Sequence, residues 1–211
     1  MDARAYPAKA TPKSLRTRAR ILDSATKLFS EVGYHAANNA MIADAAKLTR
    51  GAMLYHFATR EELVEAAIEH IEVARARLFE EAARASAAPG LDASEAAIDA
   101  YWALLHKAPF IAFTELEAAA RTDPMLRMRL AAAQAAFDHA QVGDRFGALA
   151  QAGADPRFQT SRDLGRFLLE GIARGAMTYD QSARRERLLA VVKRAVRMLN
   201  RKGDIHDLWN E

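Results

Sequence analysis

The sequence predicts an all-α protein of about nine helices, on three observations. Hydrophobic residues make up 51% of the 211 residues, and many of them are alanine, the strongest helix former. Only ten glycines and six prolines interrupt the chain. Apolar residues recur at intervals of three and four along most of it, which is the periodicity of amphipathic helices. We therefore expect a domain of three short helices followed by a larger helical domain.

The first helix is expected to begin at Ser14, a good N-cap, after a basic tail over residues 1–13 that we expect to be disordered. Gly33 follows the last periodic residue and suits a helix C-terminus. The apolar stripe between these two residues consists of Ile21, Ala25, Leu28, Phe29 and Val32.

Two shorter helices complete the domain expected over residues 14–59. Asn38 and Asn39 can cap the second helix, which should end near Lys47, and Thr49 can cap the third, which should run to about Tyr55. Two short helices joined by a turn of three or four residues have helix-turn-helix geometry.

The remaining chain predicts a second helical domain over residues 60–202 and a polar C-terminal tail over 203–211. Pro89-Gly90 and the segment from Gly153 to Pro156 mark breaks, and Asp123 followed by Pro124 marks a helix start. The expected helices cover residues 60–86, 92–107, 110–121, 124–152, 160–179 and 184–201.

Several classes of protein are excluded by what the sequence lacks. Without cysteine it can have no disulfide and no thiolate metal site. It has no run of eighteen apolar residues and no apolar segment in its first fifteen, so we expect a cytoplasmic protein with no membrane partner. It lacks His-Glu-x-x-His, phosphate-loop, dinucleotide-glycine and Gly-x-Ser-x-Gly motifs. We predict no catalytic residue, no metal site, no cofactor and no enzymatic activity.

Charge is distributed unevenly along the chain. Residues 1–60 carry ten Lys and Arg against four Asp and Glu, whereas residues 61–211 carry twenty against twenty-three. A basic N-terminal part on a slightly acidic body favours contact with a polyanion such as DNA. A basic tail is the alternative, because Arg4, Lys9 and Lys13 supply three of these charges.

The third short helix has the composition of a helix that enters the major groove. Thr49, Gly51 and Ala52 are small and let the backbone approach the bases, and Arg50 can donate two hydrogen bonds to guanine or bind phosphate. Tyr55 and His56 can reach the flanking phosphates. Leu48, Leu54 and Phe57 are expected to face inward. The alternatives are a solvated Arg50, a packing Tyr55 and a core or capping His56.

At these residues the chain resembles the DNA-binding domain of the TetR (tetracycline-repressor) family over about residues 16–63. The matching residues are Ile42-Ala43, Thr49-Arg50-Gly51-Ala52, Tyr55-His56-Phe57 and Arg60-Glu61-Glu62-Leu63. Three positions depart from the family pattern: Asn38-Asn39 replace Thr and an apolar residue, Lys47 replaces Gly, and Leu54 replaces Tyr. The DNA-binding residues that follow from the motif and the resemblance are Asn38, Lys47, Thr49, Arg50, Gly51, Ala52, Tyr55, His56 and Arg60.

The middle helices contain aromatic and polar residues that are typical of a pocket for a small, mostly apolar effector. Phe113 and Glu117 lie one helical turn apart and form the best local pair. The same composition is equally typical of a core, because aromatic residues at helical spacing usually pack. The effector-binding residues predicted here are Trp102, His106, Phe110, Phe113, Glu117, Gln134 and Phe137.

The last two helices have apolar faces, and Gly171 and Gly175 on one of these faces suggest a close approach of two helices. The resemblance implies that these helices pair with their copies in a four-helix homodimer interface. The residues predicted for it are Leu164, Phe167, Leu168, Gly171, Ile172, Gly175, Leu188, Val192 and Val196.

The resemblance implies a transcriptional regulator that binds double-stranded DNA as a homodimer. Such a protein would be a repressor of a palindromic operator, released from DNA by a small-molecule effector, with the helix over 60–86 transmitting the change. Two alternatives remain open at this point: a transcriptional activator of the same fold, and a helical protein-interaction adaptor.

Overall fold

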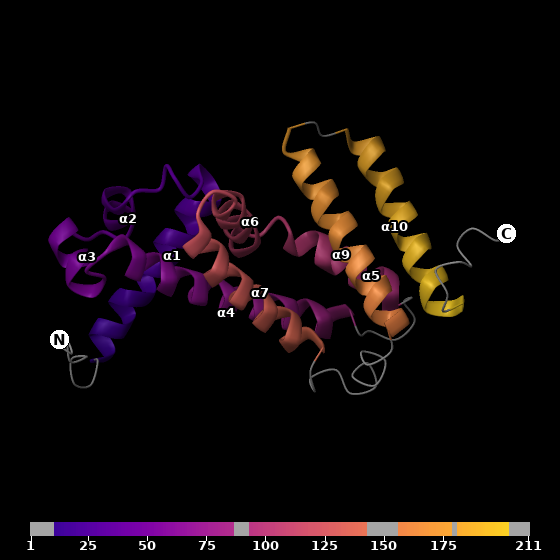
Figure 1. Ribbon diagram of the computed structural model, residues 1–211, viewed down its shortest axis with the longest axis horizontal. Helices are drawn as coiled ribbons and strands as arrows, with labels where there is room; N and C mark the ends of the chain where they lie inside the picture. The colour runs from indigo at the N-terminus through magenta and orange to yellow at the C-terminus, as the bar shows by residue number, and fades with distance from the viewer. Residues whose placement is uncertain (1–10, 87–92, 143–155, 179–180, 203–211) are drawn as a thin grey trace. The chain divides into compact units, whose positions relative to one another are not determined.

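The computed structural model describes residues 11–86, 93–142, 156–178 and 181–202. Within these residues all regular structure is helical, which confirms the predicted all-α class (Figure 1). The helices are α1 (Pro12–Val32), α2 (Asn39–Ala45), α3 (Arg50–His56), α4 (Arg60–Ser86), α5 (Ala93–Leu104), α6 (Ala108–Ala120), α7 (Pro124–Val142), α9 (Pro156–Ala176) and α10 (Ser182–Lys202).

Helix α1 begins two residues before the predicted start. Its N-cap is Thr11, whose side chain accepts a hydrogen bond from the Ser14 backbone N–H at 3.2 Å, so the prediction of Ser14 as the cap was wrong. Pro12 fits the first helical position because that position needs no N–H donor. Gly33 closes the helix with a φ of 82°, and its N–H donates to the Phe29 carbonyl, as predicted.

Two later helices begin before their predicted starts, each with a proline in its first turn. Helix α6 begins at Ala108 rather than Phe110, with Pro109 in its first turn, and α9 begins at Pro156 rather than Thr160. Helix α7 begins as predicted, because Asp123 Oδ1 accepts from the backbone N–H groups of Met125 and Leu126 at 3.0 Å. The predicted extension of this helix to 152 and the tail over 203–211 lie outside the described residues, as does most of the tail over 1–13.

The chain forms two compact units that do not divide at the predicted boundary of residue 59. Unit one contains the described residues up to Val73 together with Ile111–Ala133, and unit two contains Ala74–Phe110 and the described residues from Gln134 onward. The helix-turn-helix therefore shares its unit with the first half of α4, most of α6 and the start of α7. The boundary moves because side chains of these helices are buried in the same core as α1.

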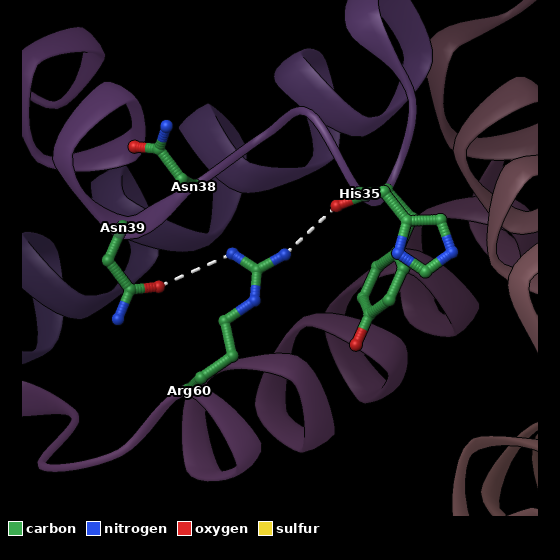
Figure 2. Close-up of a pocket in the computed structure, with 5 residues that line it drawn as sticks. His35, Asn38, Asn39 and Arg60 are labelled. Carbon is green, nitrogen blue, oxygen red and sulfur yellow. Dashed lines mark hydrogen bonds between the residues drawn. The ribbon is translucent and has the colours of Figure 1, made fainter. Parts of the chain in front are cut away.

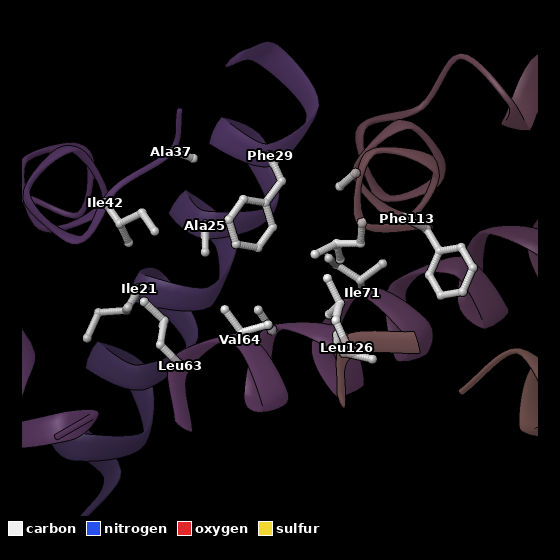
Figure 3. Packing of buried hydrophobic residues seen from close by; sticks show 14 of the residues in the cluster. Ile21, Ala25, Phe29, Ala37, Ile42, Leu63, Val64, Ile71, Phe113 and Leu126 are labelled. Carbon is white, nitrogen blue, oxygen red and sulfur yellow. The ribbon is translucent and has the colours of Figure 1, made fainter. Parts of the chain in front are cut away.

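The core of unit one gathers around α1 (Figure 3). Ile21 and Phe29 of α1 pack with Ile42 of α2 and with Leu63 and Ile71 of α4, all fully buried. Burial of a side chain of this size contributes roughly 1.5–3 kcal/mol. The remaining buried members from α6 and α7 include Ala112, Phe113, Leu116, Leu126 and Leu130. This packing fixes the first helix, against which the two short helices are held.

Unit two has two smaller buried clusters. One joins Ile98, Leu169, Val192 and Val196, and the other joins Leu104, Phe110 and Phe137. Helices α9 and α10 run side by side (Figure 1), and a Cβ at Gly165 would lie 3.3 Å from Val196 Cγ2. A side chain at 165 would therefore require Val196 to shift by a few tenths of an ångström, whereas a Cβ at Gly171 or Gly175 would meet no atom of the described residues within 4 Å. None of the described helices has the length and apolar character needed to cross a membrane.

Candidate nucleic-acid interface and effector cluster

Both short helices begin with the caps that the sequence predicts. Asn38 Oδ1 accepts hydrogen bonds from the N–H groups of Ala40 and Met41 at 3.0 Å, and Thr49 Oγ1 accepts from the Ala52 N–H at 3.1 Å. Each cap satisfies backbone donors that a helix start leaves open. These contacts set where α2 and α3 begin and hence which residues α3 exposes.

Helix α3 has one buried and one exposed face. Met53 is buried in the helix, and Phe57, one turn later at its C-cap, is buried as well. Leu54 is 36% exposed, so the prediction that it faces inward was wrong. Tyr55 is 82% exposed, and a Cβ added at Gly51 would meet nothing within 4 Å. The exposed face consists of Arg50, Gly51, Ala52, Leu54 and Tyr55.

The end of α3 is tied to α1 by Arg18, a residue that the sequence reading missed. Arg18 Nη1 donates to the backbone carbonyl of His56 at 2.6 Å, and the guanidinium lies 4.1 Å from the centre of the Phe57 ring. Burial, and then the nearby Arg18 charge, lowers the pKa of His56 below its ordinary value. The lowered pKa favours the neutral imidazole of His56 in the DNA-free chain.

Arg60 holds the start of α2 by hydrogen bonds from its guanidinium, as Arg18 holds the end of α3 (Figure 2). Its guanidinium donates to the carbonyls of Ala37 at 2.6 Å and Tyr34 at 3.0 Å, and to Asn39 Oδ1 at 3.3 Å. A cleft of about 360 Å³ opens beside it, lined by Tyr34, His35, Asn38, Asn39 and Arg60. Arg60 was predicted to bind DNA, but its guanidinium donates three hydrogen bonds to acceptors of its own chain.

The predicted effector residues are divided between the two units. Phe113 is 3% exposed in the core of unit one, and Glu117 is on the exposed side of the same helix. Trp102 and His106 contact each other in unit two, with ring centres 4.8 Å apart. The other three predicted residues, Phe110, Gln134 and Phe137, lie together around Arg75 in unit two. The split arises because α6 passes from one unit into the other after Phe110.

Arg75 is 3% exposed, and it was not predicted as a site residue. Its guanidinium carbon lies 4.2 Å from the centre of the Phe137 ring and 5.3 Å from that of Phe110. Nη2 donates to Gln134 Oε1 at 3.1 Å. We call Arg75, Phe110, Gln134 and Phe137 the Arg75 cluster.

A chain of hydrogen bonds leads away from the Arg75 cluster. Gln134 donates to Asp138 at 2.8 Å, and Arg166 donates to Asp138 at 2.7 Å and to Glu170 at 2.9 Å. Tyr101 also donates to Glu170, at 2.8 Å. Burial, followed by the charge and the hydrogen bond of Glu170, raises the pKa of Tyr101, so its hydroxyl stays protonated as a donor.

The predicted dimerisation residues fall into two groups. Val192 and Val196 are buried in the chain's own core, because α10 turns them toward Ile98 and Leu169. Phe167, Leu168 and Leu188 are exposed, Phe167 by 63%. The exposed glycines Gly171 and Gly175 lie on α9 with Phe167 and Leu168, whereas Leu164 and Ile172 are half-buried.

Two comparisons connect the helix-turn-helix with known proteins. Residues 21–67 match the family model described as bacterial regulatory proteins, tetR family. The HTH-type transcriptional regulator UidR of Escherichia coli (strain K12) is 38% identical over 52 residues, which cover 25% of this chain and 26% of UidR. The aligned segment thus spans about a quarter of this curated relative, and it is the segment that contains α2 and α3.

The helix-turn-helix part of the chain is thus similar to the TetR family. A solved TetR-family member from Streptomyces coelicolor A3 is 27% identical, with a TM-score of 0.58, and the match covers 84% of this chain and 96% of that one. The multidrug binding protein EbrR, solved in complex with ethidium, is 26% identical with a TM-score of 0.54, over 84% of this chain and 97% of EbrR. These relatives are named as regulators or binding proteins, and the TetR family is one of regulators rather than enzymes.

The structure shows the surroundings of each departure from the TetR pattern. Asn39 replaces an apolar residue and accepts a hydrogen bond from Arg60. Lys47 replaces glycine and has a φ of 54°, a conformation that costs a non-glycine residue roughly 1–2 kcal/mol. Leu54 replaces tyrosine on the exposed side of α3, next to the exposed Tyr55.

Proposed function

We propose that this protein is a DNA-binding transcriptional regulator that inserts α3 into the major groove. The observation that carries this proposal is the exposed face of α3. Tyr55 is 82% exposed and Arg50 is also exposed, although Met53 of the same short helix is buried. Arginine is the commonest reader of guanine in the major groove, and tyrosine side chains contact phosphate in protein–DNA complexes.

Gly51 supports close approach of a partner to the same face. Glycine within a helix costs roughly 1 kcal/mol relative to alanine. No atom within 4 Å of a Cβ at this position explains the choice from inside the chain. A glycine here leaves room for the groove wall and lets the backbone of α3 lie against DNA.

Phosphate contacts would come from the residues around α3. Asn38, Lys47, Thr49 and Tyr55 are exposed on α2, the turn and α3, and His56 is half-buried at the end of α3. Arg18 and Arg60 hold the two ends of the α2–α3 segment by hydrogen bonds to backbone carbonyls. We assign these two arginines a positioning role, in which they fix the angle of α3 rather than bind phosphate directly.

We further propose a homodimer that binds a palindromic operator. A single short helix contacts few base pairs, and two linked copies add their contact free energies. The exposed apolar side chains of α9 and α10 support a dimer surface. They are Phe167, Leu168, Met177, Leu188 and Val191.

Regulation would follow from binding of a small molecule in unit two. The Arg75 cluster is the group of predicted effector residues that lie together, and EbrR, which resembles this chain over most of its length, binds small molecules. A ligand shifts an equilibrium only by its difference in affinity for the two states. We propose that the effector favours a state with lower DNA affinity, so that the protein acts as a repressor released by its ligand.

A salt titration on mixed-sequence duplex DNA tests the DNA-binding proposal. The logarithm of the affinity should fall linearly with the logarithm of the salt concentration, with a slope of about −0.9 for each phosphate contacted. A Lys47→Ala variant should reduce the steepness by about one contact. A Lys27→Ala variant is the control, because Lys27 is paired with Glu31 on α1. Absence of DNA binding by a folded protein, or binding insensitive to salt, would favour a protein-interaction adaptor.

A further inference from the structure

We propose that Lys13, Arg16 and Arg20 on the exposed side of α1 form a second DNA contact, which binds backbone phosphates beside the groove that α3 enters. We call these three residues the α1 basic row. The inference rests on the proposed function, because it assumes that α3 binds DNA. It goes beyond that function, because the DNA-binding residues predicted from the sequence all lie between Asn38 and Arg60, and the row adds a separate surface with a partner of its own.

The three side chains of the α1 basic row share one face of the helix. They stand at positions i, i+3 and i+7, a spacing that aligns residues along one side of an α-helix. All three are exposed, whereas Ala25 and Phe29 on the opposite face of α1 are buried in the core. At a rise of 1.5 Å per residue the row extends about 10 Å, which equals about three base-pair steps of duplex DNA.

The charge of this row is not compensated within the part of the chain that the structure describes. The first turn of α1 has no acidic residue, and no described carboxylate pairs with the row. The first acidic residue of the helix is Asp23, whose Oδ1 lies 2.7 Å from His70 Nε2. Like charges three and four residues apart destabilise a helix, and so does a cation in its first turn. The row therefore lowers the stability of the isolated protein, and an anionic partner would offset this loss.

The α1 basic row and α3 belong to the same compact unit, in which the start of α1 lies beside α3 (Figure 1). Arg18, which lies between Arg16 and Arg20 in the sequence, donates to the carbonyl of His56 at the end of α3, at 2.6 Å. The row is thus separated from the end of α3 by about one helix diameter, 10–12 Å. Because a major groove is about 12 Å wide, the backbone that borders the groove holding α3 comes within reach of the row.

The partner that we assign to the row is phosphate rather than the edges of bases. Arginine and lysine side chains that bind phosphate oxygens position a protein on the duplex but carry no sequence information. Each neutralised phosphate releases counterions, so the row would add a strongly salt-dependent contribution to the affinity. This contribution would be the same on every sequence, which separates it from the contribution of Arg50.

Glutamine variants of the full-length protein test the assignment on mixed-sequence duplex DNA. The variants are Lys13→Gln, Arg16→Gln, Arg20→Gln and the triple substitution, because glutamine has nearly the helix propensity of lysine and arginine. Each single substitution should reduce the slope of log affinity against log salt concentration by about 0.9, and the triple substitution should reduce it by about 2.7. The sequence that the triple variant selects from random DNA should remain that of the wild type.

Lys27→Gln is the matched control. It removes one charge from the same helix at a position where Lys27 pairs with Glu31 at 3.8 Å, and it should leave the salt slope unchanged. Thermal unfolding without DNA gives a second measurement. The triple variant should melt at the wild-type temperature or slightly above it, since the substitutions remove repulsion within α1. If the triple variant does not fold, the three single variants give the slopes one by one.

The proposal is overturned if the row variants keep the wild-type salt slope, or if Lys27→Gln reduces the slope as much as a single substitution in the row. A clearly lower melting temperature of the row variants would also overturn it, because the row would then serve the fold. Failure of the proposed function gives a different result. A wild-type protein that binds no DNA removes both the regulator and the row, whereas a wild type that binds DNA with the same slope as the row variants removes the row alone.

Discussion

The two compact units differ in how exposed their candidate functional residues are and in how many helices supply them. In unit one the residues proposed to touch DNA lie on the solvent side of α3, and caps from neighbouring residues set their positions. In unit two the Arg75 cluster is buried except for the half-buried Gln134, and its residues come from α4, α6 and α7. A surface that meets a large partner can be encoded in one short segment, whereas a group that encloses a small molecule draws on distant parts of the chain.

The largest expected effect separates two phenylalanines that the sequence placed in one site. Phe113 is a core residue of unit one, so Phe113→Ala should lower the free energy of unfolding by about 3–5 kcal/mol. The milder Phe113→Leu should cost less, because it keeps a large apolar side chain in this core. Phe137→Leu should weaken ligand binding. Thermal unfolding and effector calorimetry on the wild type and these three variants would check this division, and weaker effector binding in Phe113→Leu than in Phe137→Leu would contradict it.

Two arginines of unit one should respond differently to substitution. Arg50→Ala should weaken binding to the specific site by about 1–3 kcal/mol and relax the base preference. Arg60→Ala should also weaken specific binding, because α2 loses its tie to α4, but the salt dependence should stay unchanged. Anisotropy titrations on specific and mixed duplexes at several salt concentrations give both quantities. A shallower salt slope in Arg60→Ala would show that Arg60 binds phosphate after all.

Two glycines of α9 provide a matched pair for unit two. Gly165→Leu should destabilise the fold by about 1–3 kcal/mol, because the new side chain meets Val196. Gly175→Leu should leave the monomer fold unchanged and weaken the dimer, since its surroundings within the chain are open. Sedimentation measures the dimer and thermal unfolding measures the fold. An unaltered dimer in Gly175→Leu would remove this part of α9 from the interface.

The smallest expected effect concerns the cap of the recognition helix. Thr49→Ala removes the acceptor for the Ala52 N–H and should cost about 1 kcal/mol, whereas Thr49→Ser keeps it. The melting temperature should fall by about 2–4 °C in the alanine variant alone. Equal melting temperatures in the two variants would mean that the cap does not hold the start of α3.

The contrast between the units also explains which features the sequence could predict. The caps at Asn38 and Thr49 were predictable, because a cap and its backbone partners lie within three residues of each other. The left-handed conformation of Lys47 agrees with the glycine that the TetR pattern has at this position. The fold class and most helix bounds depend on the same local rules.

Long-range contacts account for what the sequence could not predict. Arg75 and Gln134 are 59 residues apart, and Arg18 and His56 are 38 apart, so no local pattern marks either pair. Arg60 matched a DNA-contact position, yet its role depends on carbonyls more than twenty residues away. One feature of the sequence did point to Arg75. It lies on the same face of α4 as Ile71 and Leu78, and arginine is rarely buried unless it has a partner.

Selection of bound duplexes from random DNA by the purified protein, at near-physiological salt, tests the central claim most directly. The account predicts enrichment of a palindrome whose half-sites lie about one helical turn, or a multiple of it, apart, as a dimer with two α3 helices requires. It also predicts that Arg50→Ala loses preference at specific bases of each half-site. A folded protein that enriches no sequence, or whose enriched sequence is unaffected by Arg50→Ala, would contradict the assignment of α3 as the recognition helix.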